Sequence, residues 1–229
     1  MRLFVDGPWS PRRRDNHERP RLSELTMLRI LGILLIALMA ITIGALKAYR
    51  QLSPAPEPLS ATVLPAPTQV PDFSLLDHTG QSIGKDVFQG QWDLVFFGFT
   101  HCPDICPWTL QILTSAHARL VDDGQEPLPR IVLVSVDPER DTPEHLARYL
   151  GSFDDDIVGI TGNLDEIRRL TNGLGIFFEK TTGGDGDYNV DHSAAVLLID
   201  PRGELSALFR PPHDIENLVR DLPRIIGGV

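Results

Sequence analysis

The stretch from Phe96 to Pro107 constrains the fold of this chain more than any other, because it joins an apolar run to both cysteines of the protein. The run that ends near Phe99 is typical of a buried strand, and a helix-compatible segment opens at Pro107. Cys102 and Cys106 lie in the turn between them. This order of strand, thiol-bearing turn and helix predicts an α/β domain whose chemistry takes place at the turn.

An uncharged apolar run of 17 residues, Ile30 to Leu46, comes before that region. As a helix it would span about 25 Å at roughly 1.5 Å per residue, which is enough to cross a membrane. Residues 1–50 carry nine Lys and Arg against four Asp and Glu, mostly before the run. The positive-inside rule therefore predicts a cytoplasmic N-terminus and an exported remainder. A cleaved signal peptide and a core helix are the alternatives; Lys47 and the length of the run disfavour the first.

These features divide the chain into four expected parts: a cytoplasmic tail (1–29), a transmembrane anchor (30–46), an extended Pro-rich linker (47–71) and an α/β domain (72–229). The charge of the chain is uneven, because residues after 50 carry 12 Lys and Arg against 27 Asp and Glu. An acidic body argues against nucleic acid as a partner.

Apolar runs and turn signals alternate through the expected domain. They predict strands at 73–76, 81–83, 92–100, 130–136, 157–160, 193–199 and 205–209, and helices at 107–121, 143–153, 164–172 and 214–226. Thr142, just before a proline, is expected to cap the second of these helices. The Gly-rich residues 181–187 predict a loop or a hairpin tip, and the turn at 200–203 a hairpin.

The spacing of the two cysteines indicates a redox or metal pair, because a chain with only two is no disulfide scaffold. Three residues separate Cys102 from Cys106, whereas thioredoxin-type redox pairs have two between them. In a helical turn, side chains four positions apart face the same side, so the sulfurs could close a disulfide or hold a soft metal ion. The helix start would also lower the thiol pKa. Two buried cysteines acting as small apolar residues are the alternative.

Two thiolates suffice for a near-linear Cu(I) site, while zinc usually takes four ligands, so any third ligand is expected among the histidines. His192 directly precedes a predicted strand. If that strand runs antiparallel to 92–100, its start lies beside the end from which Cys102 emerges. A solvated loop histidine is the alternative. His101 is expected to point away from Cys102 in an extended backbone, and His145 to lie on the surface at a helix start.

Three separated motifs, at residues 97–107, 134–143 and 191–193, together closely resemble the Sco/SenC family of copper proteins. The resemblance covers roughly residues 70–227 and includes the membrane anchor. It implies a thioredoxin-like fold, with a central mixed sheet flanked by helices and an N-terminal transmembrane helix. It also implies a membrane-tethered copper chaperone, which delivers copper to, or prepares the thiols of, the dinuclear copper site of cytochrome c oxidase subunit 2.

Carried over residue by residue, the resemblance makes Cys102, Cys106 and His192 the copper ligands, with copper as Cu(I), Cu(II) or both. The same two cysteines would form a redox-active disulfide. The family's aspartate after the second long strand corresponds to Asp137, expected near the site as a support and not as a ligand. Asp191 could orient a ligand from the second shell or attract a cation, or serve only as a turn residue.

Three functions stay open on the sequence. The first is the copper chaperone, acting on cytochrome c oxidase subunit 2 or another copper-acceptor protein. The second is an enzyme, a thiol-disulfide oxidoreductase acting on exported proteins; the three-residue spacing and the absence of a proline before the strand that follows His192 weigh against it. The third is an assembly factor whose cysteines sense redox state.

Two locations are also open. The expected one is a bacterial cytoplasmic membrane, crossed once, with the C-terminal domain in the periplasm. The alternative is the mitochondrial inner membrane, with the domain in the intermembrane space. The short Arg-rich tail contains several acidic residues, which favours the bacterial location.

Overall fold

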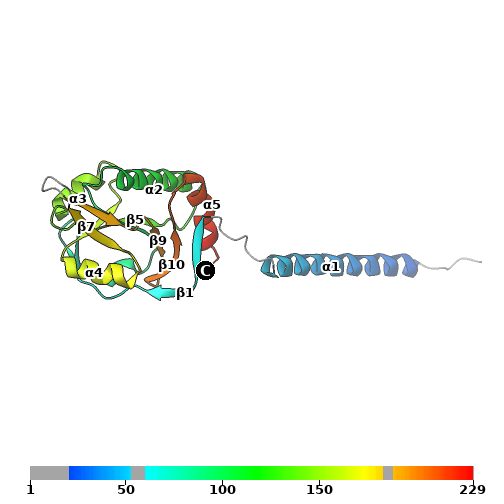
Figure 1. Ribbon diagram of the computed structural model, residues 1–229. Helices are drawn as coiled ribbons and strands as arrows, with labels where there is room; N and C mark the ends of the chain where they lie inside the picture. The colour runs from blue at the N-terminus through cyan, green and yellow to red at the C-terminus, as the bar shows by residue number, and fades with distance from the viewer. Residues whose placement is uncertain (1–20, 53–59, 183–187, 229) are drawn as a thin grey trace, which may run out of the picture. The chain divides into compact units, whose positions relative to one another are not determined.

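The computed structural model describes residues 21–52, 60–182 and 188–228, which belong to two compact units, 1–54 and 55–229. In the first unit, helix α1 (Arg21–Leu52) is a single long helix (Figure 1). Its segment Thr26–Ala48 is long and apolar enough to cross a membrane, and none of it is buried. The helix is longer than the expected anchor, and residues 1–20 of the expected tail lie outside the described residues.

The second unit alternates strands and helices. Its described elements, in chain order, are β1 (Ala61–Gln69), β2 (Leu75–Asp77), β3 (Ser82–Ile83), the 3-10 helix η1 (Lys85–Phe88), β4 (Asp93–Gly98), α2 (Ile105–Asp122), β5 (Arg130–Ser135), α3 (Pro143–Leu150), β6 (Val158–Thr161), α4 (Leu164–Gly173), β7 (Phe178–Thr182), β8 (Tyr188–His192), β9 (Val196–Ile199), β10 (Glu204–Phe209) and α5 (Ile215–Ile226). Every strand and helix predicted from the sequence within this unit is present, with bounds shifted by a few residues.

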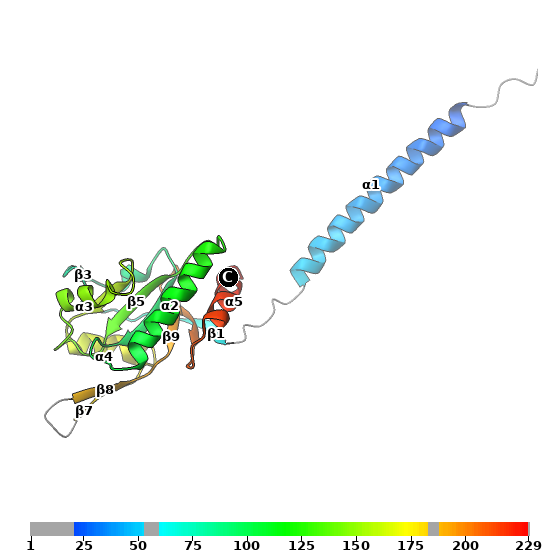
Figure 2. The same cartoon turned by 90° about the horizontal axis from the view of Figure 1, so that it is seen from above.

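Eight of the described strands form one mixed sheet in the order β1-β10-β9-β4-β5-β6-β2-β3. Strand β4 runs parallel to β5 and antiparallel to β9, and every residue of β4 is buried. Helices α2 and α5 lie side by side along one face of the sheet, and α4 lies on the other side (Figures 1 and 2). A central mixed sheet flanked by helices is the predicted fold class, which is thereby confirmed.

The structure corrects the expectation that residues 47–71 form an extended spacer. Strand β1, inside that range, pairs antiparallel with β10 and forms an edge of the sheet. Its prolines, Pro65 and Pro67, fall where the register shifts, so no ladder hydrogen bond depends on the N–H that proline lacks. An edge strand tolerates such residues, and this is why a proline-rich sequence enters the sheet here. Residues 53–59 of the expected linker lie outside the described residues.

A two-stranded ribbon, β7 paired antiparallel with β8, was only half foreseen. The sequence predicts a loop or a hairpin tip at residues 181–187, but no strand at β7 or β8. Four of the five residues of β7 are exposed, so the segment lacks the apolar alternation that signals a strand. The ribbon extends from the body of the unit (Figure 2). Its Gly-rich connection, residues 183–187, lies outside the described residues.

Local signals at two turns are confirmed. Thr142 caps α3 as predicted, because its side-chain oxygen accepts a hydrogen bond from the backbone N–H of His145 at 3.3 Å. The predicted turn after β9 is closed by a hydrogen bond from Gly203 N–H to the carbonyl of Asp200 at 2.9 Å. Gly203 has a φ of 75°, a conformation that glycine adopts without strain.

Candidate metal centre

The two cysteines lie where β4 gives way to α2. Helix α2 begins at Ile105, two residues earlier than predicted, so Cys106 belongs to its first turn. The backbone N–H of Cys106 points at the Cys102 sulfur, 3.4 Å away. A side chain at Gly98 would meet the Cys106 sulfur at 3.0 Å. Glycine at the end of β4 therefore lets the sulfur pack against the strand.

His192, the last residue of β8, reaches the cysteines from a distant part of the chain. Its Nε2 lies 3.4 Å from the Cys106 sulfur. The ring packs edge-on against Phe96 and Phe99, with centroid distances of 6.0 and 5.9 Å. Its Nδ1 lies 3.2 Å from the carbonyl oxygen of Ser193, so a proton on Nδ1 finds an acceptor and leaves the lone pair of Nε2 free.

The structure thus brings together three of the residues that the sequence analysis named. One ligand atom from each of Cys102, Cys106 and His192 lies within 4.8 Å of the other two. The antiparallel pairing of β4 with β9, on which the choice of His192 depended, is present. We call these three residues the thiolate cluster. Two sulfurs and an imidazole nitrogen form a donor set suited to a soft or borderline metal ion.

The two thiols differ in exposure and in acidity. Cys102 is half-buried and Cys106 is buried, and both are free. A hydrogen bond from the Cys106 thiol, together with a contact from His192, lowers the pKa of Cys102 to about 4. The same bond and burial raise the pKa of Cys106. At neutral pH Cys102 is therefore a thiolate, to which the thiol of Cys106 donates.

In the part of the chain that the structure describes, Asp137 contacts the ribbon that carries His192 and not the three ligands themselves. Its buried carboxylate accepts a hydrogen bond from the hydroxyl of Tyr188 at 2.8 Å and forms an ion pair with Arg140. The Arg140 guanidinium stacks on Tyr188, 3.9 Å from the ring centroid, and lies 5.6 Å from that of Phe99. Tyr188 opens β8, the strand that ends in His192. These side-chain contacts of Asp137 thus hold the ribbon that carries the candidate ligand His192.

The structure does not bring Asp191 to the cluster. Its side chain is exposed, and successive side chains of a strand point to opposite faces, so it leaves β8 on the side away from His192. Within the described residues, no hydrogen bond or ion pair joins it to Cys102 or Cys106. Glu179 stands opposite it in the register of the ribbon, which leaves two acidic side chains in solvent.

A second buried carboxylate, Asp141, acts on Cys106, and it is not among the site residues predicted from the sequence. Asp141 is buried, and its charge helps to raise the pKa of the Cys106 thiol, after the larger effects of Cys102 and burial. It accepts hydrogen bonds from the backbone N–H of Thr100 at 3.0 Å and from the hydroxyl of Ser135 at 2.6 Å. The available signal was its place in the motif Asp-Pro-Glu-Arg-Asp, of which only the first aspartate was noted.

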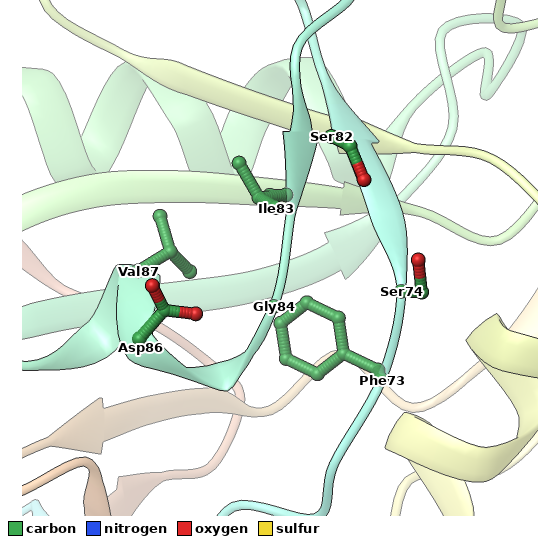
Figure 3. A pocket seen from close by; sticks show the side chains of 7 residues that line it. All are labelled: Phe73, Ser74, Ser82, Ile83, Gly84, Asp86 and Val87. Carbon is green, nitrogen blue, oxygen red and sulfur yellow. The ribbon is translucent and has the colours of Figure 1, made fainter.

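An open cavity of about 360 Å³ occupies a different part of the unit (Figure 3). It is lined by Phe73, Ile83 and Val87 with three polar side chains, Ser74, Ser82 and Asp86. Its lining contains no cysteine or histidine. The cavity is therefore separate from the thiolate cluster.

Comparison with known proteins relates this arrangement to one family. Residues 62–227 match the SCO1/SenC family. The mitochondrial SCO2 homologue of Mus musculus is 38% identical over 69% of this chain, which spans 62% of the mouse protein. Copper-bound ScoI of Arabidopsis thaliana is 32% identical, with a TM-score of 0.65 over 69% of this chain and 98% of its own. Copper-bound ScoI of Bradyrhizobium japonicum is 33% identical, with a TM-score of 0.62 over 69% and 99%.

Proposed function

The chain belongs to the SCO1/SenC family, and we propose that it is a membrane-anchored copper chaperone whose cargo ion is held by Cys102, Cys106 and His192. One observation carries the proposal: the two sulfurs and the imidazole nitrogen lie within 4.8 Å of one another although 86 positions separate the last two residues. Solved relatives that share the fold were determined with copper bound, which supports copper as the cargo.

The donor set suits both oxidation states of copper. Thiolates favour Cu(I), and an added imidazole makes a three-coordinate site that also accepts Cu(II). The Cys102 thiolate is ready to bind at neutral pH, whereas Cys106 has to release a proton to the solvent when the ion arrives. Binding is therefore expected to tighten as the pH rises.

A chaperone must also release its cargo, and the position of Cys102 supports transfer. Its side chain is only half-buried, so a thiolate of an acceptor protein can approach the ion and exchange with it. Ile105 and Trp108, 38% and 63% exposed, offer apolar surface in the first turn of α2 next to Cys106. Large exposed aromatic side chains are frequent at protein interfaces. We place the acceptor on this side of the turn.

The proposed acceptor is the dinuclear copper site of cytochrome c oxidase subunit 2, or another exported copper protein. We further propose that α1 crosses a bacterial cytoplasmic membrane once and leaves the copper-binding domain in the periplasm. The apolar segment Thr26–Ala48 and the basic residues before it support this topology. In a mitochondrion the same topology would place the domain in the intermembrane space.

A second candidate function is thiol-disulfide exchange, favoured by the thiolate of Cys102. In that reaction the Cys102 thiolate attacks a substrate disulfide, forms a mixed disulfide and displaces one substrate thiolate. Cys106 then loses its proton and attacks the Cys102 sulfur. The second substrate thiolate leaves, and the pair is oxidised by two electrons while the substrate is reduced. This activity would prepare the thiols of a copper acceptor, so it is compatible with the first.

The test is an anaerobic titration of the full-length chain in detergent with Cu(I) and with Cu(II). The variants are Cys102→Ser, Cys106→Ser and His192→Ala, and the matched control is His117→Ala, which alters a half-buried histidine on α2 outside the cluster. We expect one copper per parent chain, loss of Cu(I) in both serine variants, and a larger loss of Cu(II) than of Cu(I) in His192→Ala. Unchanged copper binding across the three variants would overturn the proposal. Rapid reduction of a model disulfide by the metal-free parent would support the second function.

A further inference from the structure

Three ligating side chains outside the thiolate cluster also converge. His101 lies in the turn after β4, Asp141 just before α3, and His145 in the first turn of α3. One ligand atom of each lies within 4.8 Å of the other two. The two imidazole rings are stacked, with centroids 5.5 Å apart and an interplanar angle of 24°. We call these residues the imidazole–carboxylate cluster.

Asp141 is a buried carboxylate with no permanent cation beside it. Its side chain is 0% exposed, and its only ion-pair partner among the described residues is His101, whose Nδ1 lies 4.0 Å from Oδ1. No lysine or arginine of the described chain forms an ion pair with it. A buried carboxylate is costly unless hydrogen bonds and a positive charge compensate it. The hydrogen bonds are present, and a bound cation would supply the positive charge.

The hydroxyl of Thr100 connects the members of the cluster. Its oxygen lies 3.0 Å from His101 Nδ1, 3.0 Å from His145 Nε2 and 2.5 Å from Asp141 Oδ1. If both imidazoles carry protons at these nitrogens, the hydroxyl accepts from both and donates to the carboxylate. If the imidazoles present lone pairs instead, the same atoms are a donor set of two nitrogens and two oxygens, in which the other three atoms lie within 3.0 Å of the hydroxyl oxygen.

We propose that the imidazole–carboxylate cluster is a second metal site, which binds a divalent first-row transition ion such as Zn²⁺. Its ligands are His101 Nδ1, His145 Nε2 and Asp141 Oδ1. Two imidazoles with one carboxylate are a ligand set that zinc accepts in proteins, and Thr100 or a water molecule can complete four-coordination. The set contains no sulfur, so it disfavours Cu(I) and differs in preference from the thiolate cluster. The His101 side chain is 47% exposed, which leaves the ion a way in from solvent.

Arg148, which contacts His145, gives the proposed metal site a second test. Its guanidinium lies 3.5 Å from His145 Nδ1, the ring nitrogen that faces away from the cluster. A donor on Nδ1 favours the tautomer with its proton on Nε2, which blocks that nitrogen as a ligand. The side chain of Arg148 is exposed and free to move aside. Removal of the guanidinium should therefore strengthen metal binding, whereas removal of the imidazole should weaken it.

The experiment uses the full-length chain in detergent with both Cys102→Ser and Cys106→Ser, so that no thiolate competes and the outcome does not depend on the proposed copper function. Zn²⁺ binding is measured by equilibrium dialysis and calorimetry. In this background we add His145→Ala, Arg148→Gln or, as the matched control, His117→Ala. Circular dichroism checks that each variant is folded, and alanine suits the helical position of residue 145.

We expect one Zn²⁺ per chain in the double serine variant and in the control. His145→Ala should lower the affinity by more than about 10-fold, since loss of a ligand costs at least as much as loss of an outer-shell partner. Arg148→Gln should raise it. Absence of Zn²⁺ binding, or binding that His145→Ala leaves unchanged, would show that the cluster is a hydrogen-bond network only and would overturn the proposal.

Discussion

Two clusters of ligating side chains each include a residue from the turn after β4, and their ligand atoms differ. The thiolate cluster presents two sulfurs and one nitrogen, and the imidazole–carboxylate cluster presents two nitrogens and one oxygen. His101 and Cys102 are neighbours in sequence, yet each serves a different cluster. A backbone hydrogen bond from Cys102 N–H to the carbonyl of Phe99 at 3.3 Å closes this turn, so one short turn supplies both a soft site and a harder one.

The largest effect is expected from Cys106→Ser, which should remove metal binding at the thiolate cluster and leave it intact at the imidazole–carboxylate cluster. This change removes a buried sulfur ligand, so stoichiometric Cu(I) binding should disappear while the Zn²⁺ affinity of the imidazole–carboxylate cluster stays that of the double serine variant. Competition with a Cu(I) chelator under anaerobic conditions measures Cu(I) binding, and equilibrium dialysis measures the Zn²⁺ affinity. The control is Thr109→Val on the same helix, where the buried hydroxyl has no hydrogen-bond partner among the described residues. Simultaneous loss of both metals would show that the clusters are not independent.

A smaller effect is expected from Tyr188→Ala, which loosens the ribbon that carries His192. The change removes the hydroxyl bonded to Asp137 and the ring on which Arg140 stacks. Second-shell changes of this kind typically cost roughly 10- to 100-fold in metal affinity. We expect a loss in that range for Cu(II), measured by chelator competition, with unchanged Zn²⁺ binding. Tyr188→Phe, which keeps the ring, should lose less; an equal loss in both would assign the effect to the hydroxyl alone.

The next effect concerns the pKa of Cys102 in the thiolate cluster, which is compared with that of a free thiol. The ultraviolet absorbance of the Cys102 thiolate should titrate with a midpoint at about 4, and Cys102→Ser provides the blank. Since this folded-state pKa lies below that of a free thiol, the stabilisation it contributes is complete above the free-thiol pKa and is lost as the pH falls through about 4. His192→Ala should raise the midpoint. A midpoint near the free-thiol value of about 8.5 would contradict this account.

The smallest effect is expected from Thr142→Ala, which removes the N-cap of α3. Loss of such a cap typically costs about 1 kcal/mol of unfolding free energy. Because the cap holds the turn that presents His145, Zn²⁺ binding should weaken a few-fold while Cu(I) binding does not change. The matched control is Asn163→Ala, which removes the cap of α4. It should lower stability to a similar extent, in chemical denaturation, without any effect on either metal.

Much of the fold could be predicted from local signals. The continuous apolar runs at β4 and β5, the cap at Thr142 and the turn at Asp200 each depend on residues within a few positions of one another, and all are present. The prediction of secondary structure failed at β1 and β7, where pairing with a neighbouring strand determines the conformation. The prolines of β1 predict an extended spacer, yet the segment pairs with β10 and forms an edge of the sheet. The polar residues of β7 form a strand only because β8 lies beside them.

The same division applies to the site. The sequence alone determined that two thiols stand four positions apart at the start of a helix, since that is a matter of spacing. It also directed attention to His192, by way of an assumed strand pairing. Only the tertiary structure decided that Asp191 leaves β8 on the far side, that Asp137 supports the ribbon, and that His145 meets His101. Those outcomes depend on how separate elements pack, and spacing along the chain does not encode which side chains then share a face.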